Sequence, residues 1–447
     1  MNRLSNVHFI GIGGISMSAI AKVLIHGKVK VSGSDSSESK TTRELESLGA
    51  QISIGHSADN IKNPDLVVYT AAVKDDNPEL ARARELGIET VARAEMLGRI
   101  MKNYKRAISV AGTHGKTTTT SMMTYILMKA CLDPTVMVGG ELDIIDGNFR
   151  IGKGDCFITE SCEYCRSFLS FFPTIAMVLN VEEDHLDYYR DLDDIKTAFT
   201  DFVSLVPEDG ILTVCADSRN TMDCLSKAKA RPITYGFENG EYRAGNLEFD
   251  DFGYPTFDVI QNGEMLARVT LGVVGRHNVL NALACFATAR AMGIDIKAIE
   301  EGLEAFSGTK RRFEKKGYCN GALIVDDYAH HPTEIEATFA SVKKIKHNTV
   351  WCIFQPHTYT RTKALFDDFV KVLSRVDRVI LTDIYAAREK DTGEVSSRDL
   401  AEKIPGAVYF SGFDKISAYI KNRAVRGDII LTMGAGNVVE IGDMIKD

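Results

Sequence analysis

The residues best suited to chemistry lie in the stretch 111–118, which reads Ala-Gly-Thr-His-Gly-Lys-Thr-Thr. An apolar run precedes this stretch and a helical pattern follows it, which predicts a strand–loop–helix unit. In such a unit the amides of the loop and of the helix N-terminus can face a phosphate. Lys116 can bring a positive charge to the outer phosphates, and Thr117 can offer its hydroxyl to Mg²⁺. The stretch therefore predicts a site for a nucleoside triphosphate.

The match to the P-loop pattern is incomplete, because Val110 stands where the first glycine of that pattern belongs. What remains is a shortened loop, Gly-x-x-Gly-Lys-Thr, at 112–117. An ordinary helix N-terminus that carries Gly-Lys-Thr by chance is the alternative. The strand before the loop and the helix after it favour the phosphate site.

A second glycine turn, at 11–14, follows the apolar run 7–10 near the start of the chain. The next strand, 30–35, ends in Asp35. This order is typical of a Rossmann-like unit, in which the turn holds a diphosphate and the acid lies near a ribose or a base. Ser16 replaces the third glycine of the dinucleotide fingerprint, so a diphosphate ligand other than NAD is favoured.

Candidate metal ligands follow two apolar runs in the middle of the chain. The run 155–160 is predicted to be a strand ending in Glu160, a common position for a metal ligand in a nucleotide-binding sheet. The run 173–180 is followed by acids and by His185, which suggests metal or phosphate contacts. Solvated acids in the first turn of a helix are the alternative for this second group.

Asn278 and Asn281 lie at the start of a predicted helix and share one of its faces. Their amides are suited either to reading the edge of a base or to capping the helix, and the sequence does not separate the two. Polar clusters also follow the predicted strands 322–326 and 349–354. In parallel sheets the crevice beyond the carboxyl ends of the strands is the usual ligand site.

The length and composition of the chain limit which kinds of protein it can be. At 447 residues, with 45% hydrophobic and 26% charged residues, the chain is expected to form two or three soluble domains. A net charge of −8 disfavours a general nucleic-acid binder. Nine scattered cysteines suit a reducing cytoplasm, and neither a signal peptide nor a membrane span is predicted. The spacing of Cys162 and Cys165 is interpreted as coincidence, because no second pair or histidine couple accompanies it.

Strands and helices alternate throughout the sequence, which predicts an α/β protein of three domains. The first domain is expected to end near Tyr104, and the second begins with the strand that enters the phosphate loop. A short basic link at 307–313 marks the second boundary. The expected domains are therefore 1–105, 106–309 and 310–447.

Taken together, these stretches resemble the Mur ligases, ATP-dependent amide-forming enzymes of peptidoglycan synthesis. The matching motifs occur in family order and span nearly the whole chain, so the ordered set is far more specific than any one of its members. They are His-Phe-Ile-Gly-Ile-Gly-Gly-Ile at 8–15, Ala-Gly-Thr-His-Gly-Lys-Thr-Thr at 111–118, Asp-His-Leu-Asp at 184–187, Arg-His-Asn-Val-Leu-Asn at 276–281, Lys-Arg-Arg-Phe at 310–313, Asp-Asp-Tyr-Ala-His-His-Pro-Thr-Glu at 326–334 and Phe-Gln-Pro-His at 354–357.

The resemblance implies a Rossmann-like N-terminal domain that binds a UDP-linked substrate and a central P-loop ATPase-like domain. A Rossmann-like C-terminal domain would admit the amino acid. It implies ATP and Mg²⁺ as cofactors and a reaction that joins L-alanine to the carboxylate of UDP-N-acetylmuramate through an acyl phosphate. The protein is expected to be cytoplasmic, monomeric or weakly dimeric, and to serve cell-wall biogenesis, cell shape and cell division.

The resemblance also implies a role for each matching residue. The implied catalytic residues are Lys116, His185 and Arg312. The implied ATP-binding residues are Gly112, Thr113, His114, Gly115, Lys116, Thr117, Thr118, His277, Asn278, Asn281, Arg311, Asp327 and His330. The UDP-linked substrate would contact Gly11, Gly13, Gly14, Ile15 and Asp35, and alanine would contact Tyr328 and Arg361. Mg²⁺ would be held by Thr117, Glu160 and His185.

One position departs from the family pattern. Relatives often carry arginine in a Pro-His-Arg-Tyr arrangement where this chain has Thr358, which leaves more of the carboxylate clamp to Arg361 and makes glycine or serine conceivable acceptors.

Three rival functions remain. One is a related ligase that reattaches recycled murein peptides, which tends to carry Phe at the position of Tyr328. The others are a nicotinamide-dependent dehydrogenase and a non-catalytic nucleotide-binding regulator.

Overall fold

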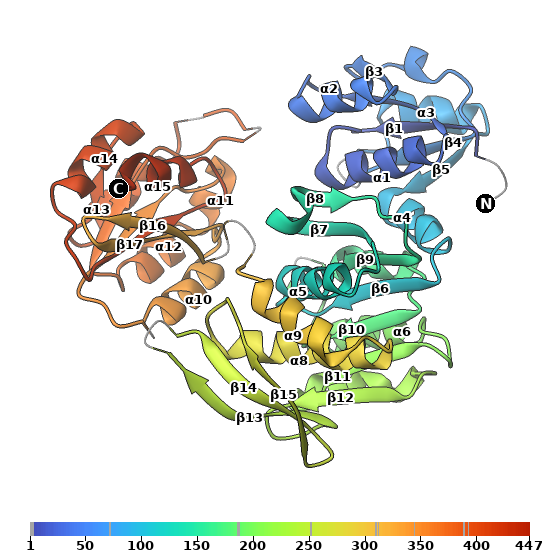
Figure 1. Cartoon of the computed structure of the whole chain (residues 1–447). Helices are drawn as coiled ribbons and strands as arrows, with labels where there is room; N and C mark the ends of the chain where they lie inside the picture. The colour runs from blue at the N-terminus through green and yellow to red at the C-terminus, as the bar shows by residue number, and fades with distance from the viewer. Residues whose placement is uncertain are drawn as a thin grey trace.

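The computed structural model describes residues 4–70, 73–185, 188–250, 253–308, 311, 313–343, 345–387, 389–391 and 393–447. Its strands form three sheets that follow one another along the chain, with helices packed on their faces (Figure 1). The N-terminal sheet lies next to the central unit, and the C-terminal unit stands to the side of both (Figure 1). The predicted three-domain α/β architecture is confirmed.

The N-terminal sheet has five parallel strands in the order β3-β2-β1-β4-β5. The strand order reverses on the two sides of β1, and ligands of such sheets bind at the carboxyl end of the strands at this point. The glycine turn at 11–14 leaves β1 there. The elements are β1 (Asn6–Ile10), α1 (Ile15–His26), β2 (Lys30–Asp35), α2 (Lys40–Ser47), β3 (Gln51–Ile54), η1 (Ala58–Asn60), β4 (Leu66–Tyr69), α3 (Pro78–Glu85), β5 (Glu89–Ala92) and α4 (Arg93–Met101).

The central sheet has ten strands in the order β15-β14-β13-β12-β11-β10-β6-β9-β7-β8. β6 lies between β10 and β9 and is parallel to both, so the loop after β6 opens at the reversal point of this sheet. The elements are β6 (Arg106–Ala111), α5 (Lys116–Lys129), β7 (Thr135–Leu142), η2 (Asp143–Ile145), β8 (Gly147–Arg150), β9 (Cys156–Ser161), η3 (Tyr164–Ser170), β10 (Ile175–Val178), α6 (Leu192–Val203), β11 (Ile211–Cys215), α7 (Arg219–Asp223), η4 (Cys224–Lys227), β12 (Pro232–Gly236), β13 (Tyr242–Phe249), β14 (Pro255–Gln261), β15 (Glu264–Thr270), α8 (Arg276–Ala291) and α9 (Ile296–Ala305).

The C-terminal sheet has six strands in the order β16-β17-β21-β18-β19-β20, and only β16 pairs antiparallel. Its central strands β18 and β21 are buried along their whole length, because helices pack on both faces of the sheet. The elements are β16 (Glu314–Cys319), β17 (Ala322–Asp327), α10 (Pro332–Val342), β18 (Val350–Phe354), α11 (Tyr359–Ala364), α12 (Phe366–Leu373), β19 (Arg378–Leu381), α13 (Ser397–Lys403), β20 (Val408–Tyr409), α14 (Phe413–Lys421), β21 (Ile429–Met433) and α15 (Val439–Ile445).

The N-terminal and central units share one hydrophobic core. Buried side chains of α4, such as Met101, belong to the same apolar cluster as Phe168 and Phe171 of the central unit. Gly98 of α4 lies so close to η3 that an added Cβ would be 2.0 Å from the carbonyl oxygen of Ser170. The packing therefore joins these two units closely through α4.

Several elements were not predicted from the sequence. β5 and α4 complete the first unit, β8 and α9 belong to the second, and β16 forms the edge of the third sheet. Residues 359–373 form two helices, α11 and α12, which are separated at Leu365. None of these additions changes the fold class.

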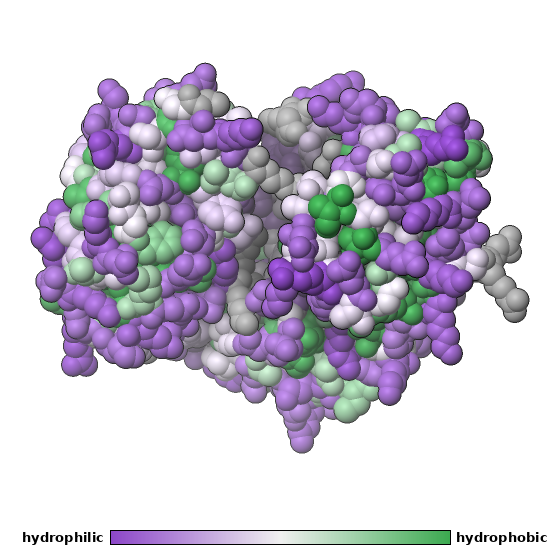
Figure 2. All heavy atoms as spheres, turned by 90° about the horizontal axis from the view of Figure 1, so that it is seen from above, coloured by the Kyte–Doolittle hydropathy of each residue, from purple (hydrophilic) through white to green (hydrophobic). Residues whose placement is uncertain are grey.

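The surface seen from above is mostly hydrophilic, with small separate hydrophobic patches, and it divides into two lobes (Figure 2). Among the described residues, no helix is both long and apolar enough to cross a lipid bilayer.

Candidate functional site

The phosphate loop joins β6 to α5 with two glycines in backbone conformations that other residues rarely adopt. The φ angle is 149° at Gly112 and 85° at Gly115. Gly115 is the N-cap of α5, and no side chain caps the free amides of the first turn. These amides are therefore available to an anion, as the sequence predicted.

Asn180 and Thr113 hold the loop against the segment that follows β10. Asn180 Oδ1 accepts from the backbone amide of His114 at 2.8 Å, and its Nδ2 donates to the carbonyl of His114 at 3.1 Å. The amide of Glu182 donates to Thr113 Oγ1 at 2.9 Å. The His114 side chain itself is mostly exposed. No role for Asn180 was predicted from the sequence, because its partner lies 66 residues away.

Lys116 folds back over its own loop. Its Nζ donates to the carbonyl of Gly112 at 2.5 Å and of Thr113 at 3.1 Å, and it lies 2.9 Å from Glu163 Oε2. All three partners are oxygen acceptors, so phosphate oxygens can take the same position around the ammonium group.

Thr117 and Glu160 lie together, as predicted for two ligands of one metal ion. Thr117 Oγ1 donates to Glu160 Oε2 at 3.0 Å, and the amide of Gly139 donates to Glu160 Oε1 at 2.6 Å. A hydroxyl and a carboxylate next to a phosphate loop form the oxygen-rich environment that Mg²⁺ prefers. Thr118, the next residue, is half-buried at the start of α5.

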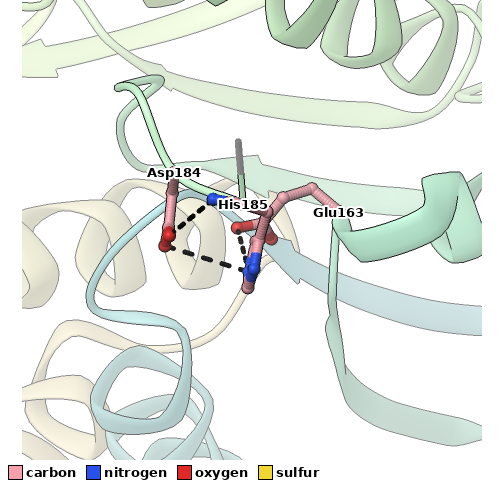
Figure 3. A group of neighbouring side chains, drawn as sticks. All are labelled: Glu163, Asp184 and His185. Atoms are coloured by element: carbon pink, nitrogen blue, oxygen red, sulfur yellow. Dashed lines mark hydrogen bonds and ion pairs between the residues drawn. The ribbon is translucent and has the colours of Figure 1, made fainter. Parts of the chain in front are cut away.

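A second group of metal-binding type contains His185, Asp184 and Glu163 (Figure 3). One ligand atom from each residue lies within 4.8 Å of the others. His185 Nε2 is 3.8 Å from Glu163 Oε1 and 3.8 Å from Asp184 Oδ2. Two carboxylates beside an imidazole can balance the charge of a divalent cation.

Glu163 contacts both groups and was not predicted from the sequence. Its side chain is only 2% exposed and contacts both Lys116 and His185. Tyr189 donates its hydroxyl proton to the backbone carbonyl of Glu163, which fixes the segment after β9. The available signal was an acid three residues beyond Glu160, at the end of the same predicted strand.

The two asparagines of α8 are buried and bonded to each other. Asn281 Nδ2 donates to Asn278 Oδ1 at 3.0 Å, and Asn278 Nδ2 donates to the carbonyl of Val274 at 2.8 Å. A Cβ added at Gly115 would lie 2.8 Å from Asn281 Oδ1, so this amide packs directly under the phosphate loop. Contact of Asn278, Asn281 or the neighbouring His277 with a base stays a prediction.

The glycine turn of the N-terminal unit is closed by Asp35. Asp35 Oδ2 accepts from the amide of Gly13 at 2.9 Å, and a Cβ at Gly13 would lie 2.8 Å from that oxygen. Gly14 is the N-cap of α1 without a side-chain cap, and Ile15, the first helical residue, is 68% exposed. The first turn of α1 therefore presents backbone amides that no side chain caps, and Ile15 offers an apolar contact to a ligand.

The C-terminal unit gathers a third set of predicted residues at the end of β17 and just beyond it. Arg311 Nε lies 3.1 Å from Asp326 Oδ2, and its guanidinium lies 5.0 Å from the ring centre of Tyr328. Asp327 accepts from the amides of Phe313 and Ala329. Burial raises the pKa of Asp326 and outweighs its bonds from Thr432 and Arg311.

His330, His357 and Arg361 form the neighbouring cluster. The rings of His330 and His357 are 5.7 Å apart, and Arg361 Nη1 lies 3.2 Å from His357 Nδ1. Because a guanidinium can only donate, Nδ1 of His357 accepts and its proton is on Nε2. Burial, followed by the charges of His330 and Arg361, lowers the pKa of His357. The ring of Tyr385 stacks on this imidazole, with the ring centres 5.7 Å apart.

The structure thus brings the predicted residues together in three groups: the phosphate loop with its acids, the N-terminal turn, and the C-terminal cluster. Arg312, Lys310 and Asp187 lie outside the described residues. The nine cysteines are all free thiols, and neither Cys162 nor Cys165 belongs to the metal-type group around Glu163.

Three family profiles match the chain in order. Residues 6–105 match the Mur ligase family, catalytic domain, residues 110–289 the Mur ligase middle domain, and residues 311–436 the Mur ligase, glutamate ligase domain. Two curated relatives are named UDP-N-acetylmuramate--L-alanine ligase. That of Clostridium botulinum (strain Okra / Type B1) is 50% identical over 443 residues, 98% of this chain and 97% of the relative. That of Acetivibrio thermocellus is 51% identical and covers 100% of this chain and 97% of the relative.

Solved structures give the same picture. The UDP-N-acetylmuramate-alanine ligase of Thermotoga maritima superposes with a TM-score of 0.79 at 30% identity and covers 98% of both chains. A murein peptide ligase of Psychrobacter arcticus superposes with a TM-score of 0.69 at 26% identity, over 99% of this chain and 98% of its own. With ordered family matches, full-length identity and the same three-unit fold, the chain belongs to the Mur ligase family.

Proposed function

We propose that this protein joins L-alanine to the carboxylate of UDP-N-acetylmuramate, with ATP as the source of energy, in peptidoglycan precursor synthesis. The observation that carries the proposal is the contact of Glu163 with both Lys116 and His185. Lys116 and His185 thus lie beside one carboxylate, which supports a role for the lysine in phosphate binding and for the histidine in metal binding. The names of the full-length relatives supply the substrates.

The chemistry requires activation of an unreactive acid. A carboxylate does not react with an amine at neutral pH, so its oxygen first attacks the γ-phosphate of ATP and releases ADP. The amine of alanine then attacks the acyl carbon of the acyl phosphate and releases phosphate. Such phosphoryl transfer depends on positioning and charge neutralisation, which Lys116 and the free amides at Gly115 supply.

The oxygen donors of Thr117 and Glu160 and the carboxylates of Glu163 and Asp184 fit Mg²⁺. When bound, Mg²⁺ would neutralise charge on the phosphates and on the substrate carboxylate. Thr117 and Glu160 would hold the ion at the phosphate loop. His185, with Glu163 and Asp184, would hold a second ion beside the substrate carboxylate.

The two ends of the molecule deliver the other reactants. The uncapped backbone amides at the start of α1, directly after the turn at Gly13 and Gly14, would bind the diphosphate of the UDP-linked substrate. In the C-terminal unit, the guanidinium of Arg361 would bind the carboxylate of alanine, next to Tyr328. Bringing three reactants together across three units favours closure of the C-terminal unit on binding.

Phosphate release from ATP in the presence of UDP-N-acetylmuramate tests the proposal, with each amino acid added in turn. We expect release that depends on alanine, with weaker use of glycine or serine. Lys116→Ala should abolish release, while Lys129→Ala, an exposed lysine at the other end of α5, should not. Release with free tripeptide but not with alanine would instead assign the chain to peptide reattachment.

A further inference from the structure

Glu79 is a fully buried carboxylate that none of the proposed chemistry uses. It lies in the first turn of α3 with 0% of its side chain exposed. Its Oε1 accepts from Asn60 Nδ2 at 2.5 Å and from the amide of Ser57 at 3.2 Å. Its Oε2 accepts from Ser34 Oγ at 2.6 Å. Burial alone would raise the pKa of Glu79, but the bonds from His8, Ser34 and Asn60 outweigh it and lower the pKa.

Two histidines complete the surroundings of this carboxylate. His8 Nε2 lies 3.4 Å from Glu79 Oε2, and its Nδ1 is 2.9 Å from Ser32 Oγ. His56 Nδ1 is 3.0 Å from Ser34 Oγ, whose only proton goes to Glu79, so His56 is the donor in that contact. A buried charge is stable only when donors surround it, and these side chains from β1, β2 and the η1 segment do so.

Ser34 connects Glu79 to the glycine turn. While its side chain donates to Glu79, its carbonyl accepts from the amides of Gly11 at 2.8 Å and Ile12 at 3.0 Å. The next residue, Asp35, accepts from the amide of Gly13. The hydroxyl of Ser34 thus bonds to the buried carboxylate, while the carbonyl of Ser34 bonds to the first amides of the glycine turn.

We propose that Glu79, through Ser34, is a positioning residue for the diphosphate-binding turn and sets the affinity for the UDP-linked substrate. The inference rests on the proposed function of that turn. Amide donors bind a diphosphate well only when they are held in place before binding, and a displacement of about 1 Å is costly. Glu79 holds the segment 34–35 through Ser34 and does not itself contact the ligand.

The isosteric change Glu79→Gln tests this role. Whichever way the glutamine amide turns, its nitrogen faces two of the four donors, because Oε1 and Oε2 each accept from two. Ser34→Ala removes only the connecting hydroxyl. The matched control is Glu85→Gln, an exposed acid at the end of the same helix.

The probes are UDP and ATP, each titrated by calorimetry into the full-length variants. We expect the Kd for UDP to rise about tenfold in Glu79→Gln and Ser34→Ala, the size of one lost charged hydrogen bond, with the Kd for ATP unchanged. Glu85→Gln should match the wild type for both. An unchanged Kd for UDP in Ser34→Ala overturns the inference even where Glu79→Gln does not fold.

A loss of ATP binding equal to the loss of UDP binding would also overturn the inference, because it would show a general structural role. The proposed function has its own test. If the wild-type protein does not bind UDP, both the proposed function and the positioning role of Glu79 are overturned. If the wild type binds UDP and Glu79→Gln has the same Kd for UDP, only the positioning role of Glu79 is overturned.

Discussion

Nζ of Lys116 lies 2.9 Å from Glu163 Oε2, while the other oxygen of this carboxylate lies 3.8 Å from His185 Nε2. One buried acid therefore connects the phosphate loop to the metal-type group. Because water has little access to Glu163, these interactions are screened far less than those of a surface pair. A cation held by His185 and a phosphate held by Lys116 would both act on the same carboxylate, which couples their binding.

Replacing Glu163 by Gln keeps the size of the side chain and removes its charge. We expect the Mg²⁺ concentration for half-maximal ADP formation to rise about tenfold or more, the usual cost of losing a group that holds or orients a metal site. A titration of activity with Mg²⁺ measures this. Glu182→Gln is the control, because Glu182 lies at the rim of the same loop with 60% of its side chain exposed. Equal Mg²⁺ dependence in both variants would contradict the role of Glu163.

The phosphate loop could be predicted from the sequence because its chemistry is local. Gly112, Gly115, Lys116 and Thr117 lie within six residues of one another, and the strand and helix on either side follow from apolar periodicity. Glu163 could not be predicted in the same way. Its contact with Lys116 spans 47 residues and depends on the pairing of β9 with β6.

The segment 162–165 shows the limit of reading residue types alone. The spacing of its two cysteines is typical of a redox or zinc motif, yet both are free thiols. The residue of this segment that belongs to the metal-type group is Glu163, which lies between them. The buried core strands β17 and β18 were predicted closely because they contain continuous apolar runs. β16 was missed because an edge strand of sequence Glu-Lys-Lys-Gly-Tyr-Cys has no alternating pattern.

Thr358 carries backbone strain that a substitution can release. Its φ of 67° and ψ of 144° lie in a region that is almost reserved for glycine. Thr358→Gly is expected to stabilise the protein by about 1 kcal/mol, because relief of strain exceeds the added flexibility of the unfolded chain. Thr197→Gly, in the exposed face of α6, should destabilise it instead. Thermal unfolding of the two variants tests the contrast, and a destabilised Thr358→Gly would refute the strain.

The lowered pKa of His357 predicts a loss of stability in mild acid. Burial is the main cause, the charges of His330 and Arg361 add to it, and Glu389 opposes it. Below the ordinary value of 6.5 the unfolded chain binds a proton that the folded chain takes up only at lower pH. Stability should therefore fall as the pH drops through this range. We would measure the unfolding temperatures of the wild type and His357→Gln from about pH 8 to about pH 5.5. The wild type should unfold at the higher temperature near pH 8, and this difference should shrink as the pH falls below 6.5. A constant difference would exclude His357 as the cause.

The close approach of α4 to η3 predicts opposite effects for two glycine-to-alanine changes. A Cβ at Gly98 would lie 2.0 Å from the carbonyl oxygen of Ser170, so either the helix or the loop must move. We expect Gly98→Ala to destabilise the protein by about 1–3 kcal/mol through overpacking. At Gly442 in α15 the nearest atom is 3.5 Å away, so alanine should stabilise that helix by about 0.5–1 kcal/mol. Equal unfolding temperatures for the two variants would show that α4 does not join the N-terminal and central units as tightly as this contact requires.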